Sequence, residues 1–173
     1  MQPVASQYSE QLEALKVLIV DDETTMRKVT RSLLQAVAVT DIHEASDGRS
    51  GLEEICRLAP DVVILDWSMP KLNGPEFVRY VRVPGSFPYP DVPIIMLTAH
   101  GERSRVVEAV RLGVNEFLIK PVSSTALLSR LISILAKPRR MVKQGDYYGP
   151  EPRKMSSYKP EIDPALNQIV LIN

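Results

Sequence analysis

The chain has 173 residues, which is room for one α/β domain of about 120 residues with extensions but hardly for a second core. Charged residues make up 24% and hydrophobic residues 45%, a balance that excludes a disordered or fibrous class. Lysine plus arginine equal aspartate plus glutamate at 21 each, so the overall charge gives no reason to expect nucleic acid or acidic lipid as a partner.

After a polar leader over residues 1–15, hydrophobic runs and amphipathic helical patterns alternate along the chain. The runs predict strands at Lys16–Val20, Ile42–Ala45, Asp61–Leu65, Val92–Leu97 and Glu116–Ile119. The patterns predict one helix from Thr24 to about Val37 and others at Gly51–Leu58, Pro75–Val81, Glu102–Leu112 and Ser123–Ala136. We therefore expect five strand–helix units over residues 16–137.

Strands with near-continuous Val, Ile and Leu need cover on both faces, and alternating helices supply it. The fold class is therefore α/β, with a doubly wound, five-stranded parallel sheet and right-handed crossovers. We expect strand order 2-1-3-4-5, a flavodoxin-like arrangement, followed by a C-terminal extension over 138–173.

Two segments fall outside this alternation. The proline-rich stretch 84–93 predicts a long surface loop before the fourth strand. The extension is basic and interrupted by Pro and Gly, so its first part resembles a linker. Its apolar end, Leu166–Ile172, predicts docking on the domain, strand addition or self-association.

The cellular compartment can be predicted from features that the sequence lacks. The single cysteine, Cys56, lies in an apolar helical pattern, so we expect a reduced core position. No run approaches the roughly 18 apolar residues of a spanning helix, and residues 1–15 are too polar for a signal peptide. These observations predict a cytoplasmic protein.

Polar side chains follow four of the five predicted strands. Asp21 and Asp22 come after the first, Asp66 after the third, Thr98 after the fourth and Lys120 after the fifth. Because parallel strands end at one edge of the sheet, these groups are expected to face a common cleft.

Crowded carboxylates repel one another and raise each other's pKa, a cost that a divalent cation removes. The donors are oxygens, and His43 and His100 are too few and too separated for a zinc cluster. Mg²⁺ is the natural candidate, with Mn²⁺ as a substitute. A cation on one side and an ammonium and a hydroxyl on the other suit phosphoryl transfer.

These residues stand in motifs that resemble the receiver domain of response regulators. The motifs are DDETTMRK at 21–28, DWSMPKLNG at 66–74, TA at 98 and KP at 120. The first of them is especially similar to the single-domain chemotaxis regulators, and the resemblance covers about residues 16–136.

The resemblance implies a role for each metal-binding position. Asp66 is the expected phosphoacceptor and also a metal ligand. Asp22 would bind Mg²⁺ directly, Asp21 mostly through water, and the backbone carbonyl of Ser68 would complete the protein ligands.

It also implies how the phosphoryl group is bound and sensed. Thr98, Ala99 and Lys120 would bind the phosphoryl oxygens, and Phe117 would act as an aromatic switch whose position follows that of Thr98. Pro121 is expected after a cis peptide bond.

Four neighbouring positions have further expected roles. Ser68 and His100 stand where the family tunes hydrolysis of the acyl phosphate, and we hypothesise that His100 hinders or orients the attacking water. Trp67 is expected to be a lid or an exposed partner contact. Gly74 is expected to supply an unusual backbone angle in a tight turn.

The implied function is a phosphorylation-activated response regulator of a two-component system. Asp66 would accept its phosphoryl group from a sensor histidine kinase or a phosphotransfer protein, which shifts the population of a protein-binding face toward a downstream target. Apart from weak self-dephosphorylation, we do not expect the protein to be an enzyme. We expect that it can form a homodimer, and we do not expect nucleic acid as a partner.

Other functions fit less well. A receiver that feeds a DNA-binding or oligomerising regulator through its extension stays open, although the extension has no helix-turn-helix pattern. A flavin carrier would need a phosphate loop where this chain has acids, and a dehalogenase-type phosphatase would place its nucleophile after the first strand. Nucleotide-binding and serine hydrolase motifs are missing from the sequence.

Overall fold

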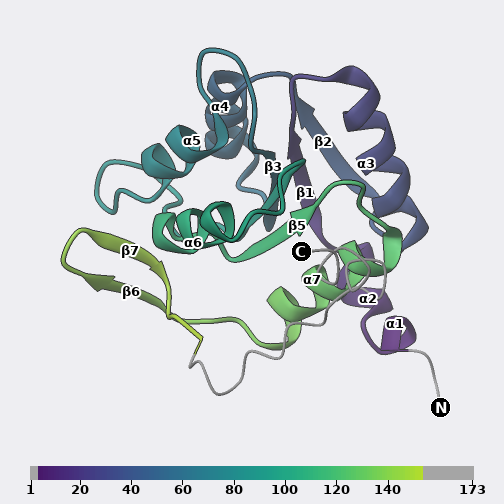
Figure 1. Ribbon diagram of the computed structural model, residues 1–173. Coiled ribbons are helices and arrows are strands. Elements are labelled where there is room, and N and C mark those ends of the chain that lie inside the picture. The colour runs from purple at the N-terminus through teal and green to yellow at the C-terminus, as the bar shows by residue number, and fades with distance from the viewer. Residues whose placement is uncertain (1–3, 154–173) are drawn as a thin grey trace, which may run out of the picture.

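The computed structural model describes residues 4–153 as a parallel sheet between two layers of helices, with a small hairpin beside it (Figure 1). The sheet holds β1 (Lys16–Val20), β2 (Asp41–Ala45), β3 (Val62–Asp66), β4 (Ile94–Thr98) and β5 (Glu116–Ile119). Its order is β2-β1-β3-β4-β5 and every neighbouring pair is parallel. The predicted fold class and strand order are therefore confirmed.

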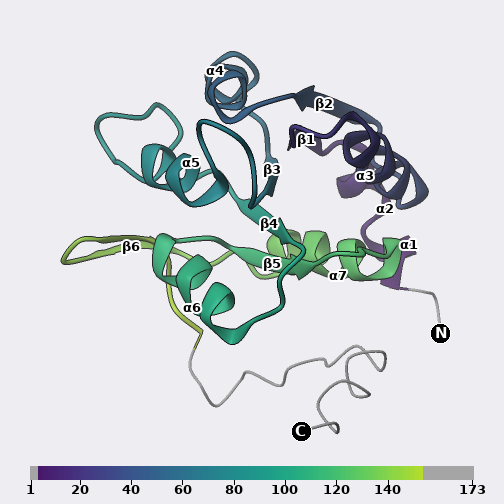
Figure 2. The same cartoon turned by 45° about the horizontal axis from the view of Figure 1, so that its top comes forward.

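Helices cover both faces of the sheet, as Figures 1 and 2 show. They are α1 (Val4–Gln7), α2 (Ser9–Glu13), α3 (Thr24–Ala36), α4 (Gly48–Leu58), α5 (Gly74–Val81), α6 (Arg103–Leu112) and α7 (Ser124–Ala136). One buried cluster joins α4, α5 and α6 to the sheet, and the other joins α2, α3 and α7 to its opposite face. Each strand has apolar side chains on both faces because each face is packed.

Side-chain caps explain where several helices begin. The carboxylate of Asp47 accepts a hydrogen bond from the Ser50 backbone N–H at 2.8 Å, so α4 starts at Gly48, three residues earlier than predicted. Asn73 and Glu76 form a reciprocal capping box at the start of α5, with both hydrogen bonds 2.9 Å long. This box fixes where the chain turns after β3.

The structure corrects the expected burial of Cys56 and shows that part of the leader lies in the core. Leu12 and Leu15 of the leader are buried in the cluster under α3 and α7, so the leader contributes to the core despite its polar composition. Cys56 is exposed, because the buried side of α4 is carried by Gly48, Gly51 and Ile55.

The first part of the extension forms a hairpin where a linker was expected. Strands β6 (Met141–Gln144) and β7 (Tyr147–Pro150) pair antiparallel, and Gly145 at the turn has a left-handed φ of 60°. The hairpin lies next to α6. Within residues 138–153 there is no helix-turn-helix, and Leu166–Ile172 lie outside the described residues.

Across residues 4–153, the helices are all too short or too polar to cross a bilayer.

Candidate functional site

The carboxyl edge of the sheet brings the predicted site residues together. Asp21 and Asp22 follow β1, Asp66 ends β3, Thr98 ends β4 and Lys120 follows β5. Because β1, β3, β4 and β5 are adjacent and parallel, their ends meet at this edge.

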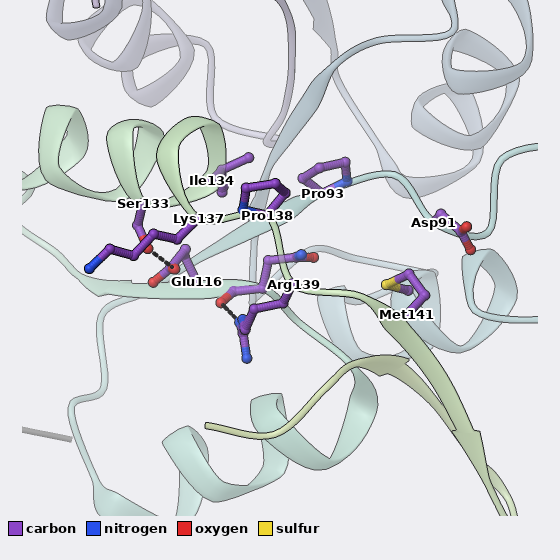
Figure 3. Close-up of a pocket in the computed structure, with 10 residues that line it drawn as sticks. Asp91, Pro93, Glu116, Ser133, Ile134, Lys137, Pro138, Arg139 and Met141 are labelled. Carbon is purple, nitrogen blue, oxygen red and sulfur yellow. Dashed lines mark hydrogen bonds between the residues drawn. The ribbon is translucent and has the colours of Figure 1, made fainter. Parts of the chain in front are cut away.

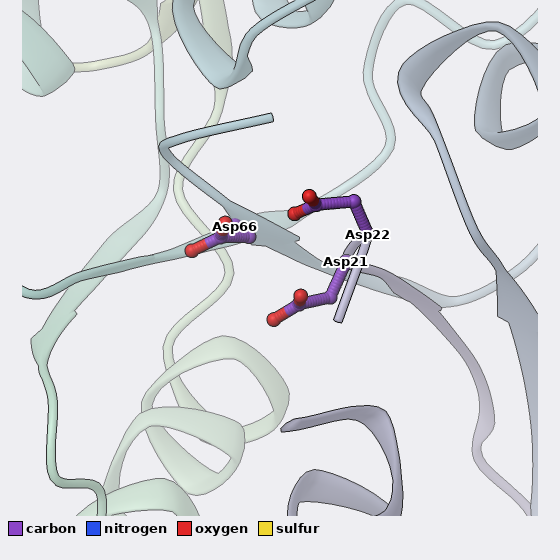
Figure 4. Close-up of side chains that lie close together, drawn as sticks. All are labelled: Asp21, Asp22 and Asp66. Carbon is purple, nitrogen blue, oxygen red and sulfur yellow. The ribbon is translucent and has the colours of Figure 1, made fainter. Parts of the chain in front are cut away.

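Three carboxylates form the centre of the site. Asp21, Asp22 and Asp66 each offer an oxygen, and these oxygens lie within 4.8 Å of one another. Figure 4 shows the three side chains converging from the ends of two neighbouring strands. Asp21 and Asp66 are buried, whereas Asp22 is exposed. Hard oxygen donors with one open side match the preferences of Mg²⁺, which keeps several of its waters.

Lys120 supplies the positive charge opposite these acids. Its ammonium lies 2.7 Å from Asp66 Oδ1 and 3.5 Å from Asp21 Oδ2. Burial raises the pKa of Asp66, and the neighbouring charges of Asp21 and Asp22 add to this against the opposing effect of Lys120. Burial opposes the charge on Lys120, but its hydrogen bond to Asp66 and the nearby acids raise its pKa overall.

Arg27 holds the loop after β1 and was missed in the sequence. Its Nη1 donates to the Asp21 backbone carbonyl at 2.8 Å, and its Nε lies 3.2 Å from Glu44 on β2. The Asp21 carboxylate in turn accepts from the Glu23 backbone N–H at 2.8 Å. The role of an arginine in the first turn of α3 could not be predicted from the local sequence, because its partners come from two different segments.

The predicted phosphoryl-binding and tuning residues surround the carboxylates. Thr98 is buried, and its Oγ1 accepts a hydrogen bond from the His100 backbone N–H at 3.1 Å. Ala99, His100 and Ser68 are exposed at the same edge. The Lys120–Pro121 peptide bond is cis.

Trp67 is only 5% exposed, which corrects the expectation of an exposed contact. The Arg105 guanidinium covers one side of its ring at 4.8 Å from the centroid. Phe117, half-buried on β5, meets the same ring edge-on, with centroids 6.5 Å apart and planes at 83°. The residue next to Asp66 is thus in contact with both α6 and the predicted switch residue.

Gly74 is required for space and not for backbone angle. It lacks the left-handed φ found at Gly85, Gly113 and Gly145. A Cβ at Gly74 would lie 2.7 Å from the Asp66 carbonyl oxygen. The start of α5 therefore packs directly against the backbone of the predicted phosphoacceptor.

Residues 17–132 match the family model described as the response regulator receiver domain. The chain belongs to this family. The match spans the whole sheet and the carboxylate site.

Individual receiver proteins are also similar to this chain in sequence and structure. The chemotaxis protein CheY1 of Helicobacter pylori is 35% identical over 122 residues, which is 70% of this chain and 97% of that protein. A structure of the chemotaxis protein CheY4 of Vibrio cholerae has 34% identity and a TM-score of 0.60, covering 68% of this chain and 95% of the other. A Borrelia burgdorferi CheX-CheY-BeF3-Mg+2 complex has 26% identity and a TM-score of 0.65, covering 71% and 90%. Response regulator receivers are signalling domains, and this receiver carries their acidic cluster.

Proposed function

We propose that this receiver accepts a phosphoryl group on Asp66 from a sensor histidine kinase or a phosphotransfer protein. The observation that carries the proposal is the pairing of Asp66 with Lys120 inside a cluster of three carboxylates. That arrangement offers an oxygen nucleophile, a cation site and a fixed ammonium within one edge of the sheet.

Each residue has a defined part in the transfer. An Asp66 oxygen forms the new bond to phosphorus while the bond from phosphorus to the donor nitrogen breaks, and the electron pair of that bond leaves with the donor imidazole. Lys120, now paired with Asp66, would bind a phosphoryl oxygen, together with the Thr98 hydroxyl and the Ala99 segment.

Asp21, Asp22, Asp66 and the Ser68 carbonyl would hold the cation. Mg²⁺, when bound there, neutralises negative charge on the incoming group, and Mn²⁺ would substitute for it. The oxygen-only donor set supports this assignment. The related complex from Borrelia burgdorferi, named for BeF3 and Mg+2, points the same way.

Phosphorylation would shift a two-state surface made by α6, β5 and α7. Thr98 would move toward the phosphoryl oxygens and leave space for Phe117, which already contacts Trp67 beside the phosphoacceptor. The shifted face would then bind a downstream protein or a second copy of the chain. This output is a binding event and involves no further reaction.

Hydrolysis of the acyl phosphate would be slow and tuned by two exposed side chains. Ser68 and His100 both lie at the site edge, and His100 is fixed through its backbone N–H to Thr98. We assign His100 to hindering or orienting the attacking water. Replacing it with alanine and finding an unaltered phosphoryl lifetime would remove this role.

The signalling unit is proposed to be residues 16–137, with the leader 1–15 and the extension 138–173 added to it. The cytoplasm is its proposed compartment.

The test is phosphorylation of the purified protein by acetyl phosphate and Mg²⁺, followed by intact mass. We expect one phosphoryl group on the wild type, lost in acid or base as an acyl phosphate is. Asp66→Asn is expected to gain none, while Asp146→Asn, a control in the exposed hairpin turn, is expected to behave as the wild type. Equal labelling of Asp66→Asn and the wild type would refute the proposal.

A further inference from the structure

The β6–β7 hairpin is packed against the connection between α6 and β5. A Cβ on Gly113, the residue that ends α6, would lie 2.5 Å from the Tyr148 carbonyl oxygen, and one on Gly149 would lie 2.6 Å from Gly113 Cα. The backbones of β7 and of this connection therefore touch without side chains between them. The Tyr148 hydroxyl also donates to the Asp91 carboxylate in the loop before β4.

The base of the hairpin is bonded to Asn115, the residue before β5. Arg139 donates through Nη2 to the Asn115 carbonyl, and through Nη1 to the Glu151 carbonyl at 3.3 Å. Glu151 closes the base, since its N–H donates to the Arg140 carbonyl at 2.8 Å. The two sides of the base are thus held together and to Asn115.

Glu116, the first residue of β5, provides a second attachment. Its carboxylate is buried and accepts from Ser133 Oγ on α7 at 2.9 Å and from the Arg153 guanidinium beyond the hairpin. A buried carboxylate bound by an arginine is a strong, directional contact. The extension is therefore anchored to β5 and α7 as well as to α6.

A hollow of about 320 Å³ lies beneath this base, between the end of α7, the start of β5 and β6 (Figure 3). Its lining includes Glu116, Lys137, Arg139 and Met141. No residue of 138–153 belongs to either buried apolar cluster, so apart from the backbone contact at Gly113 the hairpin is held by polar contacts at the rim of this hollow. Such contacts can break without opening the apolar core beneath the helices.

The attached elements are those that carry the switch. β5 holds Phe117 immediately after Glu116 and leads into Lys120, which bonds to Asp66. α6 carries Arg105, which covers Trp67. If β5 or α6 moves as a rigid element when the phosphoryl site changes, it carries Asn115, Glu116 and Gly113 with it, and these are the residues that the hairpin contacts.

We propose that the β6–β7 hairpin is a built-in brake on the receiver switch. It binds α6 and β5 in the arrangement where Lys120 is paired with Asp66, and it loosens when a phosphoryl group occupies the site. The proposal rests on the proposed function, because it assumes phosphorylation at Asp66. The coupling is reciprocal: the free energy by which a bound phosphoryl group weakens hairpin docking equals the free energy by which the docked hairpin weakens phosphoryl binding.

A purely structural hairpin would behave differently. Gly149 and Pro150 are buried, so the hairpin also covers surface, and that role alone predicts the same protection with and without a phosphoryl mimic. A brake and a purely structural hairpin therefore differ in one measurable property, which is whether a phosphoryl mimic at the far edge of the sheet changes the protection of the hairpin amides.

The experiment is hydrogen exchange of the full chain with Mg²⁺, with and without beryllofluoride. Amides of residues 141–150 are expected to exchange roughly fivefold faster when beryllofluoride saturates the site, within the usual range of coupling. Amides of α4, which packs on β1, β2 and α5, are expected to be unchanged. Equal exchange of residues 141–150 in both conditions would overturn the brake.

The reciprocal measurement is beryllofluoride affinity, followed by the fluorescence of Trp67, the single tryptophan of the sequence. Arg139→Gln combined with Tyr148→Phe removes two rim contacts, and we expect roughly fivefold tighter binding. Arg57→Gln breaks an exposed pair with Glu54 on α4 and is expected to match the wild type. An affinity of the double variant equal to or weaker than that of the wild type would contradict the proposal.

The outcomes also separate this proposal from the function beneath it. If wild-type protein shows no beryllofluoride-dependent signal from Trp67 and no phosphorylation on Asp66, the proposed function fails. If both occur and the hairpin amides do not respond, only the brake fails.

Discussion

The Arg105 guanidinium lies over the indole ring of Trp67, 4.8 Å from the ring centroid. This contact joins the first turn of α6 to the residue that follows Asp66. Phe117 is a second neighbour of the same ring. Two elements of the proposed switch, α6 and β5, therefore meet at a single side chain next to the phosphoacceptor.

Replacing Arg105 tests this contact. Arg105→Gln should expose one side of Trp67, shift its fluorescence emission to longer wavelength and lower the free energy of unfolding by about 0.5–1 kcal/mol. Urea unfolding followed by fluorescence measures both effects. Arg103→Gln, on the exposed part of the same turn, is the matched control, and identical spectra for the two variants would show that the contact contributes nothing.

Adding Mg²⁺ should stabilise the folded protein by relieving repulsion among Asp21, Asp22 and Asp66. At a hundred times the dissociation constant, the expected gain is about 2.7 kcal/mol, seen as a higher Tm. Asp22→Asn should lose most of this gain without damaging the core, because Asp22 is exposed. Asp146→Asn should keep it, and an undiminished Mg²⁺ effect in Asp22→Asn would argue against this ligand.

Glu44 should make stability depend on acid pH. Burial opposes its charge, but hydrogen bonds and charges from Arg31 and Arg27 outweigh this and lower its pKa below the ordinary value of 4.5. The ionised carboxylate therefore stabilises the fold above that pH, and this contribution is lost as pH falls through the folded value.

The corresponding variant is Glu44→Gln. It should be less stable than the wild type at pH 7, and the gap should close as pH falls below 4.5 and through the lowered pKa of the folded Glu44 carboxyl. Chemical unfolding at a series of pH values measures this. Glu53→Gln, an exposed acid on α4, serves as the comparison, and a gap for Glu44→Gln that is constant with pH would disprove the assignment.

Arg82 is the most consequential buried charge outside the site. It donates to the carbonyls of Gly113, Pro90 and Val92 and, at 2.9 Å, to Asn115 Oδ1. Burial lowers its pKa to about 10, so the guanidinium stays protonated at neutral pH. It thereby ties the loop after α5 to the residues that the hairpin contacts.

Arg82→Met should lower the free energy of unfolding by about 3 kcal/mol, because four acceptors lose this donor and the bonds to two of them, the Gly113 and Val92 carbonyls, are buried. Arg79→Met, an exposed change on the preceding helix α5, should cost far less. Thermal unfolding of the two variants provides the comparison. Similar melting temperatures would mean that water replaces the guanidinium at little cost.

The sequence by itself determined the alternation of strands and helices, their parallel order and the acids at the strand ends. The elements follow from local periodicity, and each acid is adjacent in sequence to the strand that positions it, as Asp66 is at the end of β3. Even so, helix starts depended on caps, so α4 begins at Gly48 through the Asp47 side chain.

Only the tertiary structure decided the burial of Trp67, the exposure of Cys56 and the use of the extension as a hairpin on α6 and β5. Arg105, Arg82 and Arg139 find their partners across long stretches of chain. Such contacts depend on which surfaces folding brings together, so a local pattern of side chains does not predict them.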